Sequence, residues 1–403
     1  MIAICVAGVP AENELRDRLP EIFAKSAEHY RALDAAATPL MKDGDGIFRY
    51  PHGFDRTKRE LVVFPVSGWT AGHFPGSLWY LHEATGDPFF RDRAEAWTDI
   101  LAENAKVTDN HDVGFIMNCS YGNARRILRT DRHDALLVEA AESLSKRFND
   151  RLGLIRSWGD IDETEDFLVI PDNMMNLELF EVASAISGNT RFDRIARSHS
   201  DVTMRNHFRA DGGSYHVLNY CQKDGRVQEI RRGQGAMVGT AWSRGQSWAI
   251  YGYAMMYRFT KDAKYLSFAE KVADFAIGNP NMPEDGVPYW DYGAPGEERD
   301  SSAAAIMASG LLDLCLSSGR EKAGRYRAFA VKQLTALASS AYFSEGDEIG
   351  HFLLKHGVGA KPGGCEIDTP LNYGDYYFLE ALLRFRGLPK EPACPVRAPG
   401  TRP

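Results

Sequence analysis

The chain has 403 residues, of which 44% are hydrophobic and 25% are charged, and its formal net charge is −8. This is the composition of a globular protein, and the absence of a basic stripe argues against nucleic acid as a partner. No stretch is long and apolar enough to span a bilayer, which argues against a membrane protein.

The six cysteines are scattered along the sequence, and none belongs to a C-x-x-C pair. This pattern argues against a zinc site and against a dense disulfide framework. The first residues, Met1 to Val9, are weakly apolar but lack the basic start and the length of a secretory core. We therefore expect free thiols and a cytoplasmic protein, with a mature periplasmic form as the alternative.

A first amphipathic helix is predicted over residues 12–35, and a polar, turn-rich segment follows as far as Ser67. After this segment, a long helix, a short polar turn and a second helix recur. An imperfect repeat of this size is typical of stacked helical hairpins. The turns centre on Asp87, Asp131, Asn189, Asp262 and Arg320.

The two helices of each predicted hairpin differ in character. Those after the turns are amphipathic, whereas those before the turns are apolar almost all round and should be buried. With the first helix counted as an outer one, six buried helices are ringed by six surface helices. This predicts an all-α (α/α)6 barrel in one domain, residues 1–403, with a superhelical solenoid as the alternative. No run of alternating strands is predicted, although short hairpins in loops such as 213–222 remain open. The buried helices are 74–84, 115–128, 174–186, 247–259, 303–316 and 376–385.

Aspartates precede several of these buried helices. Asp112, Asp172, Asp300 and Asp375 all do so, and Arg244 opens another. In a barrel of parallel inner helices these N-termini lie at one end, so we expect a polar cleft there. A helix cap is the favoured interpretation of Asp300 and Asp375, and taken alone Asp172 also fits a cap. Two neighbouring carboxyl groups instead suit acid/base chemistry, because each destabilises the ionised form of the other.

Large aromatic residues occur in loops with small neighbours, where little core needs filling. Four tryptophans are of this kind: Trp69, Trp158, Trp242 and Trp290. Stacking of their flat rings on the faces of sugars would explain this placement. The alternative is that each plugs a loop onto the barrel. His216 lies in the loop after the third outer helix. A lone histidine usually has a structural role, which is the favoured interpretation, and a role in the site is the alternative. Carboxylates with aromatic walls fit chemistry on a carbohydrate.

At these residues the sequence resembles glycoside hydrolase family 88, the unsaturated glucuronyl hydrolases. The similar segments run in family order between about residues 67 and 385, and their combination is specific. They are Gly72-His73-Phe74-Pro75-Gly76 with Trp79, His111-Asp112-Val113-Gly114-Phe115, Asp172-Asn173-Met174-Met175-Asn176, Trp242-Ser243-Arg244-Gly245-Gln246-Ser247-Trp248-Ala249, Asp300-Ser301-Ser302-Ala303 and Gly374-Asp375-Tyr376-Tyr377-Phe378-Leu379-Glu380-Ala381.

The resemblance implies an (α/α)6 barrel that hydrates the C4=C5 double bond which polysaccharide lyases leave in a terminal uronate. Asp172 matches the residue that donates a proton to C4 and then accepts one from the attacking water, and Asp112 matches its partner. The implied partner is an unsaturated uronate oligosaccharide, with no metal or other cofactor. The loop 363–368 departs from the family pattern, which leaves the preferred disaccharide open. The residues that match substrate contacts or pocket walls are His216, Gln234, Arg244, Trp248, Trp242 and Trp158, to which the loop argument adds Trp69.

Three alternatives remain. The related family 105, the unsaturated rhamnogalacturonyl hydrolases, shares the fold and the chemistry, but the segment 244–248 favours family 88. A sugar epimerase would usually work through several histidines, whereas here mainly His111 and His216 are at hand. A non-catalytic oligosaccharide-binding protein would keep the tryptophans without needing both Asp112 and Asp172. The oligomeric state is not predicted.

Overall fold

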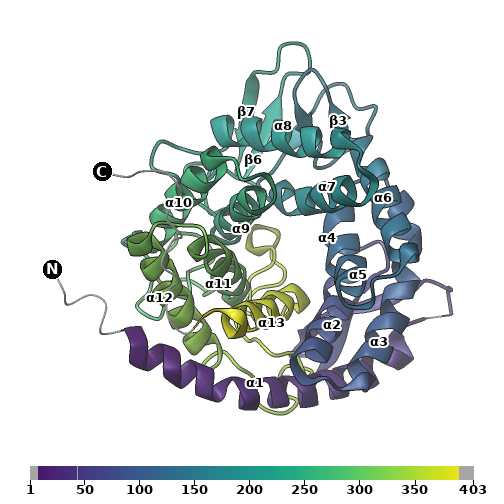
Figure 1. Cartoon of the computed structure of the whole chain (residues 1–403), viewed down its shortest axis with the longest axis vertical. Coiled ribbons are helices and arrows are strands. Elements are labelled where there is room, and N and C mark those ends of the chain that lie inside the picture. The colour runs from purple at the N-terminus through teal and green to yellow at the C-terminus, as the bar shows by residue number, and fades with distance from the viewer. Residues whose placement is uncertain (1–7, 43, 390–403) are drawn as a thin grey trace, which may run out of the picture.

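The helices form two concentric rings in the computed structural model, which describes residues 8–42 and 44–389 (Figure 1). Over these residues the rings contain twelve helices, counting α4 and α5 as one. The inner ring consists of α2 (His73–Thr85), α4 (Val113–Met117) with α5 (Asn123–Leu128), α7 (Asn173–Ser187), α9 (Ser243–Thr260), α11 (Ser301–Cys315) and α13 (Asn372–Gly387). The outer ring consists of α1 (Gly8–Ala37), α3 (Pro88–Asp99), α6 (Asp131–Ser145), α8 (Thr190–Asn206), α10 (Ala263–Ile277) and α12 (Arg320–Leu337).

The chain closes on itself into a barrel. α13 packs between α11 and α2, while α1 packs against both α12 and α2, so the first and last helices complete the two rings. This closure confirms the predicted (α/α)6 barrel and excludes the open solenoid. Shorter helical turns are η1 (Thr38–Leu40), η2 (Ile100–Lys106), η4 (Lys361–Gly363) and the π-helical turn η3 (Asn118–Gly122), which joins α4 to α5.

The predicted polar turns separate the inner from the outer helices. Gly86 and Gly188 end α2 and α7 in the left-handed conformation, with φ of +73° and +71°, which glycine adopts without steric cost. The side chains of Asp87, Asn189 and Asp262 then each accept a backbone N–H at the start of the following outer helix. These caps satisfy N–H groups that the helix itself leaves unpaired, so each hairpin has a defined beginning and end.

The inner helices are buried along most of their length. In α11, every residue from Ser301 to Leu312 is buried. Small side chains allow close approach between neighbours: a Cβ atom on Gly310 would lie 2.9 Å from the Cα of Tyr251 in α9. The apolar character that the sequence shows on all sides of these helices is therefore matched by contacts on all sides.

Strands occur only as short pieces beside the barrel in the described residues. β5 (Leu168–Val169), β6 (Val217–Tyr220) and β7 (Val227–Arg231) form an antiparallel sheet, so the hairpin left open near residues 213–222 is present. β3 (Phe148–Asn149) pairs with β4 (Leu154–Ile155). The segment predicted to be polar and turn-rich as far as Ser67 instead contains β1 (Arg49–Asp55) and β2 (Glu60–Pro65), which pair as a hairpin. Pro51 and Gly53, both poor strand formers, hide β1 in the sequence.

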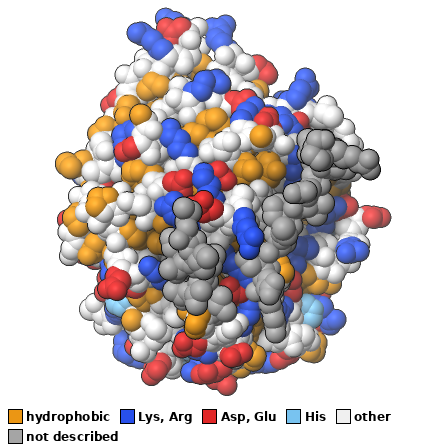
Figure 2. Space-filling view, turned by 60° about the vertical axis from the view of Figure 1, so that its left-hand side comes forward, with side chains coloured by type: hydrophobic (Ala, Val, Ile, Leu, Met, Phe, Trp, Pro, Cys, Tyr) orange, Lys and Arg blue, Asp and Glu red, His pale blue; other side chains and the backbone are white. Residues whose placement is uncertain are grey.

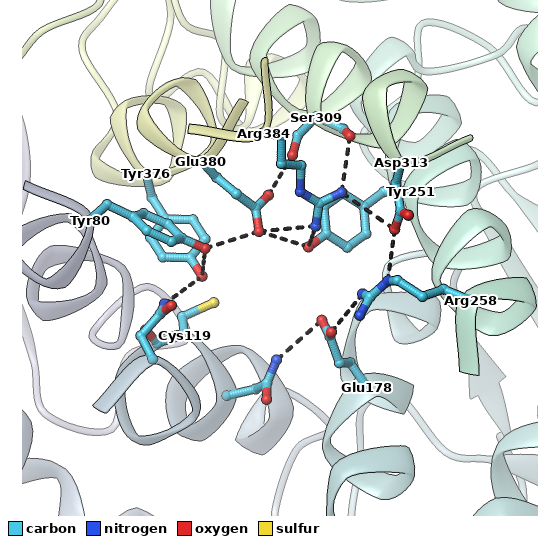
Figure 3. Close-up of polar contacts among 12 residues, drawn as sticks. Tyr80, Cys119, Glu178, Tyr251, Arg258, Ser309, Asp313, Tyr376, Glu380 and Arg384 are labelled. Atoms are coloured by element: carbon cyan, nitrogen blue, oxygen red, sulfur yellow. Dashed lines mark hydrogen bonds and ion pairs between the residues drawn. The ribbon is translucent and has the colours of Figure 1, made fainter. Parts of the chain in front are cut away.

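A polar network joins the middle and C-terminal parts of the inner helices (Figure 3). Glu380 of α13 accepts hydrogen bonds from the hydroxyl groups of Tyr80 and Tyr251 at 2.9 and 3.0 Å. Arg384 pairs with Glu380 at 3.2 Å, and Arg258 of α9 pairs with Glu178 and Asp313. A cavity of about 860 Å³ lies among these side chains. Because each of these two arginines has carboxylate partners, neither cation is left unpaired, and the network ties neighbouring helices together.

Acidic and basic side chains are interspersed over the face of the molecule that Figure 2 shows. Within residues 8–42 and 44–389, no helix has both the length and the apolar character needed to cross a membrane.

Candidate active site

Asp172 lies directly before α7, but its side chain does not cap the helix. Its backbone is already helical, with φ −54° and ψ −29°, and the carboxyl group accepts no hydrogen bond from the first turn. The Oδ1 atom is buried without a hydrogen-bond partner, while the side chain as a whole is 15% exposed. The capping interpretation of Asp172 is therefore excluded, and the carboxyl group is free to act on a ligand.

Asp112 is brought to the same place by a close contact between α4 and α7. The Asn176 side-chain oxygen accepts the backbone N–H of Phe115 at 2.8 Å. A Cβ atom on Gly114 would lie 2.5 Å from the Cα of Asn176, so only glycine allows this approach. Asp112 also makes no capping hydrogen bond, and its side chain is 16% exposed. Two motifs that are distant in sequence thus meet at one end of the barrel.

Asp112 and Asp172, called the aspartate pair from here on, both have a raised pKa. Burial raises the pKa of Asp172 to about 7, against the opposing charge of Arg244. Burial together with the negative charge of Asp172 raises the pKa of Asp112 to about 8, against the opposing charge of Arg147. Neighbouring carboxyl groups titrate as a unit, so the singly protonated form of the aspartate pair is most abundant between these two pKa values.

His216 faces Asp172 as a neutral hydrogen-bond donor. Its Nδ1 accepts the backbone N–H of Gln234 at 2.7 Å, which assigns the ring proton to Nε2. Nε2 lies 3.8 Å from Oδ1 of Asp172 and is buried without a partner. Burial and the nearby charge of Arg244 lower the pKa of His216 to about 3. The imidazole therefore stays uncharged while its N–H is directed to the acid.

Arg244 is 2% exposed, and its positive charge lowers the pKa of Asp172 against the effect of burial. Its terminal nitrogens donate to the carbonyl oxygens of Val358 and Gly359 and to the Gln234 side chain, and one lies 3.5 Å from Asp300. Its Nε–H has no partner. The Nε–H is thus the one donor of this guanidinium that is buried without a partner.

Aromatic rings surround these polar groups. Trp242 lies with its ring 4.4 Å from the guanidinium of Arg244 and 4.5 Å from the ring of His216. Trp158 packs edge-on against His216 at 6.2 Å and is 37% exposed, so it forms the outer part of the wall. An apolar side wall that remains open to solvent suits the stacking of a sugar ring.

Two further tryptophans lie deeper. Trp248 of α9 is fully buried, and its indole N–H interacts with Asp172 closely enough to lower the pKa of that carboxyl, without a hydrogen bond of ordinary length. The ring of Phe115 separates Trp248 from Trp69, with centroids at 5.1 and 5.4 Å respectively. Through these contacts all nine residues that the sequence assigned to the site are connected, and their individual roles stay predictions.

The structure separates the other two aspartates from the acid/base chemistry. Asp300 caps α11 by accepting the backbone N–H groups of Ser302 and Ala303, as predicted. The prediction that Asp375 caps the sixth inner helix was wrong. α13 begins at Asn372, so Asp375 lies inside its first turn and accepts two N–H groups of the loop 353–354. Its carboxyl group fixes that loop instead of starting the helix.

Sequence reasoning missed three polar residues near the site. His52 of β1 lies 2.7 Å from Glu366, which belongs to the loop 363–368 that differs from the family pattern. The charge of Arg244 acts on Glu366. Nothing in the sequence of β1 marked His52, although the unusual loop had singled out the region of Glu366. Arg147, just after α6, is buried next to Asp112. It gave no signal, because basic residues are ordinary at the end of an amphipathic helix.

Within residues 8–42 and 44–389, no group of three or more His, Cys, Asp and Glu side chains could hold a metal ion. The polar groups gathered at this end of the barrel are the aspartate pair, Arg244 and His216, beside a wall of tryptophans.

Comparisons with known proteins identify the family of the chain. No family model matches the chain. It is 39% identical over 366 residues to an unsaturated glucuronyl hydrolase of Formosa agariphila, covering 90% of each chain. It is 30% identical to an unsaturated chondroitin disaccharide hydrolase of Streptococcus pyogenes, covering 91% of this chain and 93% of the relative. A solved unsaturated glucuronyl hydrolase specific for heparin superimposes with a TM-score of 0.83 at 38% identity, covering 90% of this chain and 96% of that structure. The chain belongs to the family of unsaturated glucuronyl hydrolases.

Proposed function

We propose that this protein hydrates the C4=C5 double bond of the terminal unsaturated uronate in lyase-generated oligosaccharides, releasing a 4-deoxy-5-keto uronate and the remaining sugar. The observation that carries the proposal is the aspartate pair: two carboxyl groups that cap nothing, reach solvent and share a proton near neutral pH. A binding protein would gain nothing from two such carboxyl groups, since burying them costs stability.

In the proposed reaction, Asp172 donates its proton to C4 and positive charge develops at C5 and the ring oxygen. The resulting carboxylate of Asp172 then accepts a proton from a water molecule, whose oxygen bonds to C5. The hemiketal formed at C5 opens as the bond between C5 and the ring oxygen breaks, which leaves a ketone at C5. The ring oxygen becomes a hydroxyl on C1, and the hemiacetal at C1 releases the remaining sugar. One water molecule is consumed and Asp172 ends protonated, as it began.

Asp112 and His216 support this cycle in different ways. As a carboxylate, Asp112 stabilises the cationic transition state and keeps the shared proton in the pair. His216 cannot take the proton itself, because burial holds its pKa near 3. Its Nε2–H instead faces the Oδ1 atom of Asp172 at 3.8 Å, where a small movement of either side chain would let it orient the carboxyl group.

Arg244 is the proposed partner of the uronate carboxylate. Its Nε–H is the unengaged donor of a buried cation, and a charge-assisted hydrogen bond to it would fix the sugar ring relative to Asp172. The ring of Trp242, 4.4 Å from the guanidinium, holds the cation in place.

The substrate class follows from the shared chemistry of the relatives. One is named for heparin and another for chondroitin disaccharides, and lyases acting on such uronate-containing chains leave the same unsaturated uronate at the cleaved end. The part of the substrate that reacts is thus common, whereas the leaving sugar and its sulfation differ. We infer that this protein acts on unsaturated products of glycosaminoglycans.

The test is the ultraviolet absorbance of lyase-generated disaccharides mixed with the purified protein. The conjugated double bond absorbs and the hydrated product does not. Loss of absorbance with a heparin- or chondroitin-derived disaccharide is the expected result, and the ranking within the panel gives the leaving-sugar preference. Loss confined to pectin-derived products would move the protein to the rhamnogalacturonyl alternative. No loss with any member, from folded protein, would refute the proposed activity.

A further inference from the structure

Arg147 is a buried cation whose acidic neighbours, Asp109, Asp112 and Asp160, act on its charge from beyond ion-pair distance. Only 2% of its surface is exposed, and within residues 8–42 and 44–389 no carboxylate lies within ion-pair distance of it. Arg156 shares this burial, and its charge acts on Arg147. Taking an unpaired guanidinium out of water is costly, so its placement calls for a functional explanation.

The guanidinium of Arg147 connects the loop before Asp112 with the loop that contains Trp158. It donates to the carbonyl oxygen of Thr108 at 2.7 Å, four residues before Asp112. It also donates to the carbonyl oxygens of Arg156 and Gly159, at 2.8 and 3.0 Å, which flank Trp158. Three hydrogen bonds from one planar fork thus hold two loops in a fixed relation.

These hydrogen bonds continue to β5, the strand that precedes Asp172 in the sequence. Ser157, within the segment that Arg147 holds, accepts the backbone N–H of His111 at 3.2 Å and donates its own N–H to Leu168 of β5. Its hydroxyl oxygen accepts the backbone N–H of Ile170 at 3.1 Å. A displacement of Arg147 would therefore reach both members of the aspartate pair through the backbone.

Besides the hydrogen bonds that Arg147 makes to the loop before Asp112, its positive charge acts on the Asp112 carboxyl group. Four titratable or charged groups act on the Asp112 carboxyl group or face it. They are Asp172, just before α7, Arg147, just after α6, and Asp109 and His111 in the same loop as Asp112. Asp109 is exposed, so solvent screens its charge, and burial keeps His111 neutral. Arg147 is therefore the group that favours the Asp112 carboxylate, as Arg244 favours the Asp172 carboxylate.

Resting on the function proposed above, we propose that Arg147 is a positioning residue for the reaction. Its fork holds the segments bearing Asp112 and Trp158, and its charge favours the carboxylate form of Asp112, so that the shared proton moves to Asp172 when substrate binds. The uronate carboxylate supplies the trigger. Pairing with Arg244 neutralises the cation beside Asp172, which leaves Arg147 as the uncompensated cation of the site. The proton then lies on the aspartate that must deliver it to C4.

The test compares three variants over a range of pH with an unsaturated disaccharide that the wild-type protein turns over. Arg147→Met removes charge and fork, Arg147→Lys keeps the charge, and Arg156→Met removes a guanidinium of equal burial that binds the carbonyl oxygens of Asp166 and Glu163 instead. Arg147→Met should shift the acidic limb of kcat upward by roughly one pH unit or more. Arg147→Lys should keep the wild-type acidic limb but lower kcat/KM about 10-fold or more, because the two loops are no longer fixed. Arg156→Met should leave the limb in place.

Two outcomes would overturn the proposal. The first is an Arg147→Met variant with the wild-type acidic limb and merely a lower melting temperature, which is what a purely structural arginine predicts. The second is an Arg147→Lys variant with unchanged kcat/KM. This second arm decides the question even if Arg147→Met does not fold. A wild-type protein without activity on any unsaturated disaccharide would instead refute the proposed function, so the two failures are distinguishable.

Discussion

The Nε2 atom of His216 lies 3.8 Å from the Oδ1 atom of Asp172, and neither atom has a hydrogen-bond partner in the described structure. Buried polar atoms without partners are rare in proteins and are commonly found where a ligand completes the arrangement. The gap is too long for a direct hydrogen bond, yet a small movement of either side chain would close it. This geometry suits a carboxyl group that must change between acid and carboxylate during one turnover.

Replacing the acid should stop turnover without unfolding the protein. Asp172→Asn is expected to lower kcat by about 1,000-fold or more, since the amide can neither donate a proton to C4 nor accept one from water. The affinity for an unsaturated disaccharide, measured by calorimetry, should stay within a few-fold. Glu181→Gln is the matched control, because Glu181 lies on the same helix, is 6% exposed and has a pKa raised to about 7 by burial. A control variant as inactive as Asp172→Asn would contradict the assignment.

The rate should depend on pH through the aspartate pair. Activity needs one proton on the pair, because Asp172 must be an acid while Asp112 is a carboxylate. With pKa values of about 7 and about 8, the singly protonated form is most abundant between these values. A bell-shaped kcat/KM profile that falls on both sides of this window is expected, measured by the absorbance assay in buffers of constant ionic strength. A rate that rises steadily to pH 10 would rule out an essential acid of this kind.

The aspartate pair should cost stability at alkaline pH. In the unfolded chain the pKa of aspartate is about 3.9, and folding raises it for both members. A group whose pKa is raised by folding contributes most below its unfolded pKa, and that contribution is lost as the pH rises through the folded pKa. Asp112→Asn should therefore be more stable than the wild type by roughly 1–3 kcal/mol at pH 8.5, and by much less at pH 5. Urea denaturation at both pH values measures this, and a less stable variant at pH 8.5 would contradict it.

Arg244 should act mainly on substrate binding. Arg244→Lys keeps a cation but loses the Nε–H, so KM should rise about 10-fold or more while the protein remains folded. Arg244→Ala is expected to raise KM further and also to lower the melting temperature, because Asp300 and two carbonyl oxygens lose a buried donor. The control is the methyl ester of the substrate, which lacks the uronate carboxylate. If Arg244→Lys weakened the binding of the substrate and of its methyl ester by the same factor, Arg244 would not be the carboxylate partner.

Much of the barrel could be predicted because its inner helices are apolar on all sides and its turns use glycine and capping residues. Asp172 and Asp112 could be predicted as a pair because both precede inner helices that must be parallel. What the sequence could not show is where a helix starts to within a few residues. That uncertainty turned Asp375, which lies inside α13, into a supposed cap.

Contacts between distant segments were also beyond the sequence. β1 was hidden by Pro51 and Gly53, and its His52 reaches Glu366 across more than three hundred residues. Arg147 looked like any basic residue after an outer helix, whereas its three backbone partners belong to loops that only the fold brings together. The motif residues were therefore predictable, and the residues that hold them in place were not.

The most direct test of the central claim is the reaction in heavy water, followed by NMR of the uronate product. Proton delivery from the aspartate pair to C4 predicts one deuterium at C4 in every product molecule formed by the wild-type protein, added to one face of the ring, together with loss of the C4=C5 signals. Release of a uronate that still carries the C4=C5 double bond and no deuterium at C4 would show ordinary cleavage of the glycosidic bond, and would contradict the account.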